Sequence, residues 1–103
     1  MITIDIVRNV NNEIVSFTLN GHAGYDVQGK DIVCAAVSSI AITTINGIIS
    51  LDESIDYEED SGLLKIRVLK DTEVNEKLLN NLVNMLSELV SQYPKNIEIR
   101  NED

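Results

Sequence analysis

The chain contains one histidine and one cysteine, and these two residues are the ones best suited to nucleophilic chemistry. His22 and Cys34 are separated by a glycine-rich stretch of the sequence. A neighbouring imidazole can take the proton of a thiol, and the resulting thiolate is a strong nucleophile toward a carbonyl carbon. The pair therefore indicates a candidate nucleophile and its general base.

The position of Cys34 near the start of an expected helix strengthens this interpretation. Asp31 is a suitable N-cap for a helix that begins near Ile32. A thiol in the first turn faces partly unpaired N–H groups and the positive end of the helix dipole, and both favour a thiolate. The same amides, including that of Cys34, are expected to stabilise the oxyanion that forms when the sulfur attacks a peptide carbonyl.

Each of the two residues also has a purely structural interpretation. A lone cysteine between Val33 and Ala35 is typical of a small buried hydrophobe. A histidine in a glycine-rich turn is typical of a polar loop residue. The residues alone leave these alternatives open. One histidine and one cysteine far from any paired carboxylates do not form a zinc site, so we expect no metal and no cofactor.

Supporting roles around the pair are assigned to five residues, Gly21, Gly24, Gly29, Asp31 and Ser38. The glycines are typical of turns with unusual backbone angles, and they can also contact a substrate. Asp31 caps the helix and can also orient His22. Ser38 follows Cys34 by one helical turn, where its hydroxyl can bond to a substrate, to the histidine or back to its own helix.

Alternating apolar residues predict a β-hairpin at the start of the chain. The expected apolar positions are Ile2, Ile4 and Ile6 on the first strand and Val15, Phe17 and Leu19 on the second. Residues 20–30 contain three glycines and are expected to form a loop that is long enough to move. This loop would carry His22 toward the helix that carries Cys34.

An uncharged run predicts the first helix, which begins near Ile32 and ends around 47–50. The run is as long as a membrane span. However, its serine, threonine and asparagine side chains would be costly in hydrocarbon, and no basic cluster flanks it. We therefore expect a packed helix and no association with a membrane.

A second hairpin and a second helix complete the expected fold. The two strands of this hairpin are expected at about residues 55–57 and 63–69. The helix begins after Thr72 and has an apolar stripe formed by Val74, Leu78, Leu82, Met85 and Leu89. Residues 97–100 can add a short edge strand. The sequence therefore predicts one α+β domain over residues 1–103, of order β-β-α-β-β-α, with a mostly antiparallel sheet packed against two helices.

Composition restricts the partners and the compartment. The chain has 17 acidic and 8 basic side chains, a formal net charge of −9, which disfavours direct binding to nucleic acid and anionic lipid. The same charge would attract a basic partner, although excess acid also serves solubility. A single cysteine forms no internal disulfide, and residues 1–5 lack the basic and apolar regions of a secretory signal, so we expect a cytoplasmic protein.

Two sequence blocks at this spacing closely resemble the ribosomal-processing cysteine protease family, Prp. The first is Gly21-His22-Ala23-Gly24-Tyr25, and the second runs from Gly29 through Asp31 and Cys34 to Ser38. The resemblance implies that Cys34 is the nucleophile and His22 the general base, as a dyad with no obligatory third member. It also implies that Gly21, Asp31 and Ser38 belong to the signature around the site.

The same resemblance implies a substrate and an assembly state. Family members remove the N-terminal extension of large-subunit ribosomal protein number twenty-seven, cutting after a phenylalanine in a short apolar motif, and this removal is needed for ribosome assembly. They form homodimers, and the loop between the two catalytic residues is thought to rearrange around the substrate. Two other functions fit the residues: a non-catalytic assembly factor that binds a basic ribosomal protein, and a redox sensor in which Cys34 is oxidised reversibly.

Overall fold

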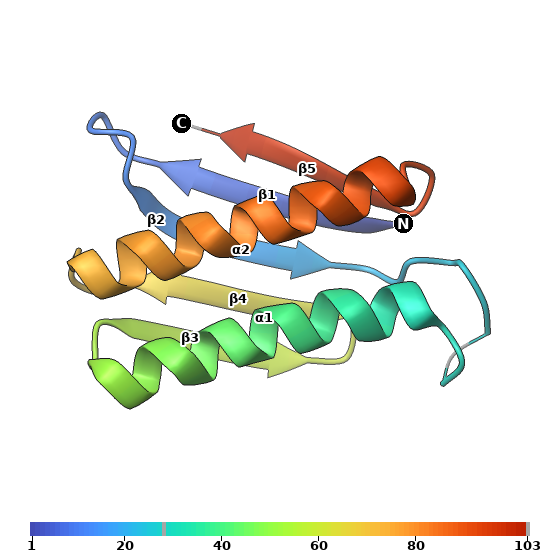
Figure 1. The fold of residues 1–103 in the computed structure, drawn as a ribbon, viewed down its shortest axis with the longest axis horizontal. Helices are drawn as coiled ribbons and strands as arrows, with labels where there is room; N and C mark the ends of the chain where they lie inside the picture. The colour runs from blue at the N-terminus through green and yellow to red at the C-terminus, as the bar shows by residue number, and fades with distance from the viewer. Residues whose placement is uncertain (28, 103) are drawn as a thin grey trace.

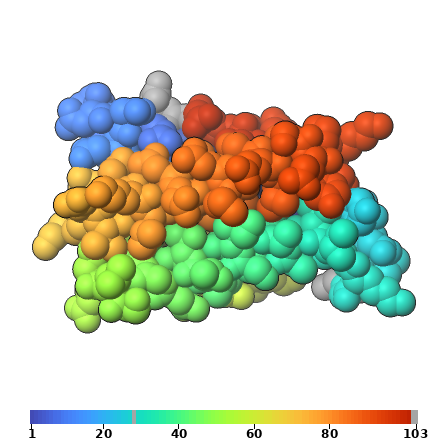
Figure 2. Space-filling model, in the orientation of Figure 1, coloured from blue at the N-terminus to red at the C-terminus, as the bar shows by residue number. Residues whose placement is uncertain are grey.

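The computed structural model describes residues 1–27 and 29–102, which form one sheet with two helices on one of its faces (Figure 1). The elements in chain order are β1 (Ile2–Arg8), β2 (Ile14–Asn20), α1 (Ile32–Leu51), β3 (Ile55–Asp60), β4 (Leu63–Val68), α2 (Glu73–Gln92) and β5 (Ile97–Glu102). The predicted fold class and element order are confirmed, and the tail does add a strand. Figure 2 shows the two helices lying along each other across this face, with the loop before α1 at one end.

The five strands have the order β3-β4-β2-β1-β5, which places β1 and β2 near the centre of the sheet. The pairs β1–β2, β2–β4 and β3–β4 are antiparallel, whereas β5 returns after α2 to pair with β1 in parallel. Because β2 is an inner strand, its end is held on both sides by hydrogen bonds. The residue that follows β2, Gly21, is the first residue of the loop that carries His22.

The core lies between the helices and the covered face of the sheet. Ile4, Ile6, Phe17 and Ile66 are fully buried there, as the alternating pattern predicts. Burial of each such side chain contributes about 1.5–3 kcal/mol relative to exposure. The opposite face of the sheet is polar, and Arg100 pairs with Asp5 across it. The site is therefore built on a sheet and a helix that share one packed core.

Two details of the apolar pattern were predicted wrongly. A bulge at Val7 and Arg8 shifts the register of the first hairpin, so that Ile14 enters the core and Val15 is exposed. In α2 the fully buried apolar line is Leu79, Leu82 and Leu86, whereas Met85 is exposed. The apolar face of this helix is wide, and contact with the sheet and α1 decides which line lies at its centre.

The helix α1 has the length and apolar content of a membrane span, with a mean hydropathy of 2.0. In the folded chain it packs against α2 and buries a stripe at four- and three-residue steps, formed by Val33, Val37, Ala41, Ile45 and Ile48. Ile32, Ile49 and Leu51 are exposed on other sides of the helix. One face of the helix thus joins the core, and an apolar surface remains uncovered by the chain itself.

Candidate active site

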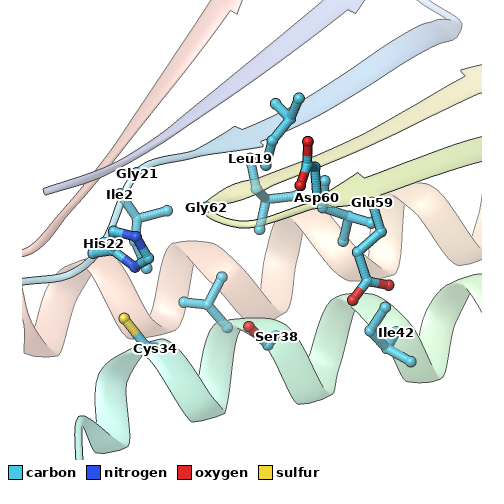
Figure 3. Close-up of a pocket in the computed structure, with 13 residues that line it drawn as sticks. Ile2, Leu19, Gly21, His22, Cys34, Ser38, Ile42, Glu59, Asp60 and Gly62 are labelled. Carbon is cyan, nitrogen blue, oxygen red and sulfur yellow. The ribbon is translucent and has the colours of Figure 1, made fainter. Parts of the chain in front are cut away.

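His22 and Cys34 face each other where the loop after β2 passes the first turn of α1. His22 follows β2 in the loop of residues 21–30, and Cys34 lies in the first turn of α1. Figure 3 shows the sulfur of Cys34 pointing toward the ring of His22. Within the described residues no hydrogen bond joins the two side chains, and Cys34 is a half-buried free thiol. The fold therefore brings together the two residues that the sequence proposed as a pair.

Asp31 caps α1 with one carboxylate oxygen and holds the loop with the other. Its Oδ1 accepts hydrogen bonds from the backbone N–H groups of Val33 and Cys34, both at 3.0 Å. Its Oδ2 accepts from those of Tyr25 at 2.9 Å and Asp26 at 3.1 Å. The predicted cap is thus confirmed. Asp31 contacts Cys34 only through the backbone N–H, and no hydrogen bond joins it to His22 within the described residues.

Two opposing effects determine the ionisation of Asp31. The side chain is only 8% exposed, and this burial raises the pKa of the carboxyl. The four N–H groups that donate to it lower the pKa, and together they hold it below its ordinary value of 3.8. Asp31 is therefore a carboxylate at neutral pH, which matches its use as an acceptor of four hydrogen bonds.

The amide of Cys34, which the sequence predicts as an oxyanion donor, is bonded to Asp31 in this structure. The N–H groups of Val33 and Cys34 are already bonded to Asp31 Oδ1, and that of Ala35 donates to the Asp31 carbonyl at 3.1 Å. These hydrogen bonds are the ordinary consequence of a well-formed N-cap. A helix amide that serves an oxyanion would therefore have to turn from Asp31 to the substrate, so this role stays a prediction.

One backbone group that the sequence does not reveal points at the sulfur. The N–H of Ala23 donates to Cys34 Sγ at 3.2 Å. The carbonyl of the same residue accepts a hydrogen bond from Asn96 Nδ2 at 2.9 Å. Asn96 lies in the turn between α2 and β5, where the ring of Tyr93 also packs edge-on against Tyr25, with centroids 5.5 Å apart. The loop that carries His22 is therefore tied to a distant part of the chain.

The glycines of the loop adopt the backbone angles that the sequence predicts. Gly21, Gly24 and Gly29 have φ values of +98°, +69° and +88°, in the region that favours glycine. At Gly21 a Cβ would lie 2.5 Å from the carbonyl oxygen of Met1, so space as well as angle requires glycine. Ser38 is exposed, and its hydroxyl forms no hydrogen bond within the described part of the chain. It is therefore free to contact a substrate.

Two adjoining hollows, of about 170 and 360 Å³, share His22, Cys34 and Ser38, and Figure 3 shows the residues that line the smaller one. The smaller, which we call the apolar hollow, is also lined by Gly21 and Gly62, by Ile2, Leu19, Val37, Ile42, Leu63 and Leu64, and by Glu59 and Asp60. The larger, which we call the loop hollow, is also lined by Gly24, Asp26, Gly29, Asp31 and Ala35. All seven residues proposed for the site thus line one hollow or both. A peptide that occupied both hollows would lie next to the sulfur of Cys34.

Gly62, from the turn between β3 and β4, lies against the ring of His22. A Cβ at this position would be 3.2 Å from His22 Nε2, and the φ of +69° also favours glycine. The Gly62 carbonyl accepts a hydrogen bond from Gly21 N–H at 2.8 Å. The sequence indicates the turn but not this contact, since the β3–β4 turn meets the imidazole only in the folded chain.

We expect Gly62→Ala to impair activity more than stability, because the added methyl group pushes on the imidazole. The expected fall in kcat/KM is about 10- to 100-fold, as misplacement of a catalytic group by 1 Å can cost this much. A matched control is Asn12→Ala, which places alanine at a φ of +63° in the β1–β2 turn, away from the site. Peptide cleavage assays and thermal melts of both variants check this. An equal kcat/KM in the two variants would show that the contact with His22 is unimportant.

A free thiol beside an imidazole, at two hollows on an α+β domain, is the arrangement expected of a cysteine hydrolase, and known proteins match this chain closely. The family described as cysteine protease Prp matches residues 1–98. The ribosomal processing cysteine protease Prp of Staphylococcus aureus (strain Mu50) is 32% identical over 104 residues, covering 96% of this chain and 97% of the relative. That of Bacillus subtilis (strain 168) is 28% identical over 107 residues, with 96% of each chain covered.

Solved structures agree with these sequence matches. The crystal structure of the essential ribosomal processing protease Prp from S. aureus, with a covalently linked product peptide, superposes with a TM-score of 0.95 at 28% identity. It covers 99% of this chain and 100% of that one. A second S. aureus structure, in complex with a substrate peptide, gives a TM-score of 0.84 at 27% identity, with the same coverage. This chain therefore belongs to the cysteine protease Prp family, and it is a cysteine protease.

Proposed function

We propose that this protein is an endopeptidase that removes the N-terminal extension of large-subunit ribosomal protein number twenty-seven, with Cys34 as nucleophile and His22 as general base. The observation that carries the proposal is the meeting of the two hollows at His22, Cys34 and Ser38. An extended peptide that occupies both hollows has its backbone over the sulfur. The bond to be cut then lies beside the group that can cut it.

In the proposed reaction His22 takes the proton of Cys34, and the thiolate attacks the carbonyl carbon of the scissile bond. A C–S bond forms, and an electron pair of the carbonyl moves to its oxygen. When this pair returns, the C–N bond breaks and His22 gives its proton to the leaving nitrogen. A water molecule that loses a proton to His22 then attacks the thioester, the C–S bond breaks, and the acid product leaves while the thiol is restored.

The lining of the apolar hollow supports an apolar residue next to the cut. Six aliphatic side chains line this hollow, and they would desolvate a large apolar side chain such as that of phenylalanine. Glu59 and Asp60 lie at the same hollow, and the chain as a whole carries a net charge of −9. Ribosomal proteins are basic as a class, so this field favours their approach. The printed names of the S. aureus and B. subtilis relatives agree with a role in ribosomal processing.

We also propose that the protein acts as a homodimer in the cytoplasm. Ile32, Ile49 and Leu51 of α1 are 57%, 43% and 67% exposed, and a second copy of the chain would cover such an apolar surface. A free thiol as the only cysteine suits a reducing compartment. A mass of one chain by light scattering, at the concentration used for assay, would contradict the dimer.

Mass spectrometry of the extended ribosomal protein tests the proposed function. The substrate is incubated with the wild type and, separately, with Cys34→Ala, and both enzymes are first shown to be folded and reduced. We expect a single cut after an apolar residue near the N-terminus, seen with the wild type alone. Intact substrate in both samples would show that the protein does not cleave this ribosomal protein. It would favour a non-catalytic assembly factor that binds it.

A further inference from the structure

The Ala23 N–H is a backbone hydrogen-bond donor that lies directly against the sulfur of Cys34. It points at Cys34 Sγ at 3.2 Å, whereas the helix amides of Val33 and Cys34 are occupied by Asp31 Oδ1. When the sulfur bonds to a carbonyl carbon, the oxygen on that carbon lies next to the sulfur. A donor that already reaches the sulfur can therefore reach this oxygen after a small change of direction.

The orientation of the Ala23 backbone is held from outside the loop. Ala23 is only 2% exposed, and its carbonyl accepts a hydrogen bond from Asn96 Nδ2 at 2.9 Å. Asn96 is itself held by its backbone, because its N–H donates to Tyr93 O at 3.0 Å and its carbonyl accepts from Ile2 N at 2.9 Å. The side chain of Asn96 thus connects the catalytic loop to the start of β1 and the end of α2.

We propose that the Ala23 N–H is the oxyanion donor of this enzyme and that Asn96 is the residue that positions it. This inference rests on the proposed role of Cys34 as nucleophile. Attack by the thiolate forms the C–S bond and moves an electron pair to the carbonyl oxygen. The Ala23 N–H donates to that oxygen until the pair returns and the C–N bond breaks. Asn96 touches neither substrate nor sulfur, and it acts by holding the carbonyl of Ala23.

Variants of Asn96 test the positioning role. Asn96→Asp keeps the size of the side chain but replaces its donor with an acceptor, so the bond to Ala23 O is lost. We expect kcat to fall about 10- to 100-fold with KM changed less than about twofold, because the lost interaction belongs to the transition state. Asn96→Gln, which retains an N–H donor, is expected to recover part of the loss. Lys95→Ala, at an exposed neighbour in the same turn, is the control and should match the wild type.

An amide-to-ester exchange tests the donor itself. The full chain can be assembled by ligation at Cys34, its single cysteine, with the N–H of residue 23 replaced by oxygen. We expect this ester to lower kcat about 100-fold, the cost of losing one oxyanion donor. The matched control is the same exchange at Val27, whose N–H bonds to Asp26 Oδ1 at 2.7 Å, away from the sulfur. This control should lower kcat less than twofold, as an order of magnitude for a distant bond.

The combined variant separates the possible outcomes. If Asn96 acts through the Ala23 N–H, adding Asn96→Asp to the residue 23 ester causes little further loss of kcat. Full additivity of the two losses would overturn the role of Asn96, and an ester with wild-type kcat would overturn that of Ala23. Should the Asn96 variants fail to fold, the ester alone still decides the donor. Inactivity of the all-amide synthetic chain and the recombinant wild type alike would instead count against the proposed substrate or nucleophile.

Discussion

Replacing His22 with glutamine is expected to lower kcat/KM for peptide cleavage by about 10³- to 10⁴-fold, the upper range for loss of general acid–base catalysis. The imidazole has three tasks in the proposed reaction, since it takes the thiol proton, protonates the leaving nitrogen and activates water. Glutamine has similar bulk but performs none of them. Cys34→Ala should cost at least as much, because the nucleophile is absent.

The dyad also predicts how the two losses combine. The double variant should be no less active than Cys34→Ala alone, because His22 has no thiol to serve once the sulfur is gone. Initial rates on a peptide from the extended ribosomal protein, together with thermal melts, measure this. His22→Gln with activity within about tenfold of the wild type would reject His22 as general base, since such a loss is below that range.

Replacing Asp31 is expected to damage both the helix start and the catalytic loop, and asparagine and alanine should separate the two effects. Asp31→Asn retains an oxygen that can accept from Val33 and Cys34, but its amide group meets the N–H groups of Tyr25 and Asp26. We expect a fall in kcat/KM of about 10- to 100-fold from the displaced loop. Asp31→Ala loses the cap as well, so Tm should fall further, by about 5 °C or more.

Thr72→Ala is the control for a lost helix cap. Thr72 caps α2, where its hydroxyl accepts from Asn75 N–H at 3.1 Å. This variant should lower Tm without changing kcat/KM when the assay temperature is well below Tm. If Thr72→Ala reduced kcat/KM as much as Asp31→Asn does, the effect of Asp31 would be one of general stability and not of loop position.

Asp31 should also make stability depend on pH in one direction. Its pKa is lower in the folded chain than the ordinary value of 3.8, so the unfolded chain binds the proton more readily. The contribution of Asp31 is therefore complete above about pH 4 and is lost as the pH falls through the lowered folded-state pKa. In melts from pH 6 to pH 3, the wild type should lose more Tm than Asp31→Asn. Parallel curves for the two proteins would contradict this.

Local elements could be predicted because their causes lie within a few residues of one another. The N-caps at Asp31 and Thr72 and the turn at Gly62 all depend on neighbouring side chains and backbone angles. The predicted burial of Val15 and Met85 was wrong because contacts between residues far apart in the sequence determine which side chains are buried. The bulge that exposes Val15 is set by strand pairing, and the buried line of α2 is set by its neighbours. Neither is visible in a periodic pattern.

The candidate site divides in the same way. The residue types and the order of strand, glycine loop and capped helix follow from the sequence, which makes His22 and Cys34 a candidate pair without showing that they meet. Three features are visible only in the folded chain: Asp31 binds the helix amides, Gly62 lies against the imidazole, and Asn96 holds the loop from 73 residues away. These contacts depend on the fold because hydrogen bonding and packing are short-range in space. They act between groups that the folded sheet and helices bring together, whatever their separation along the chain.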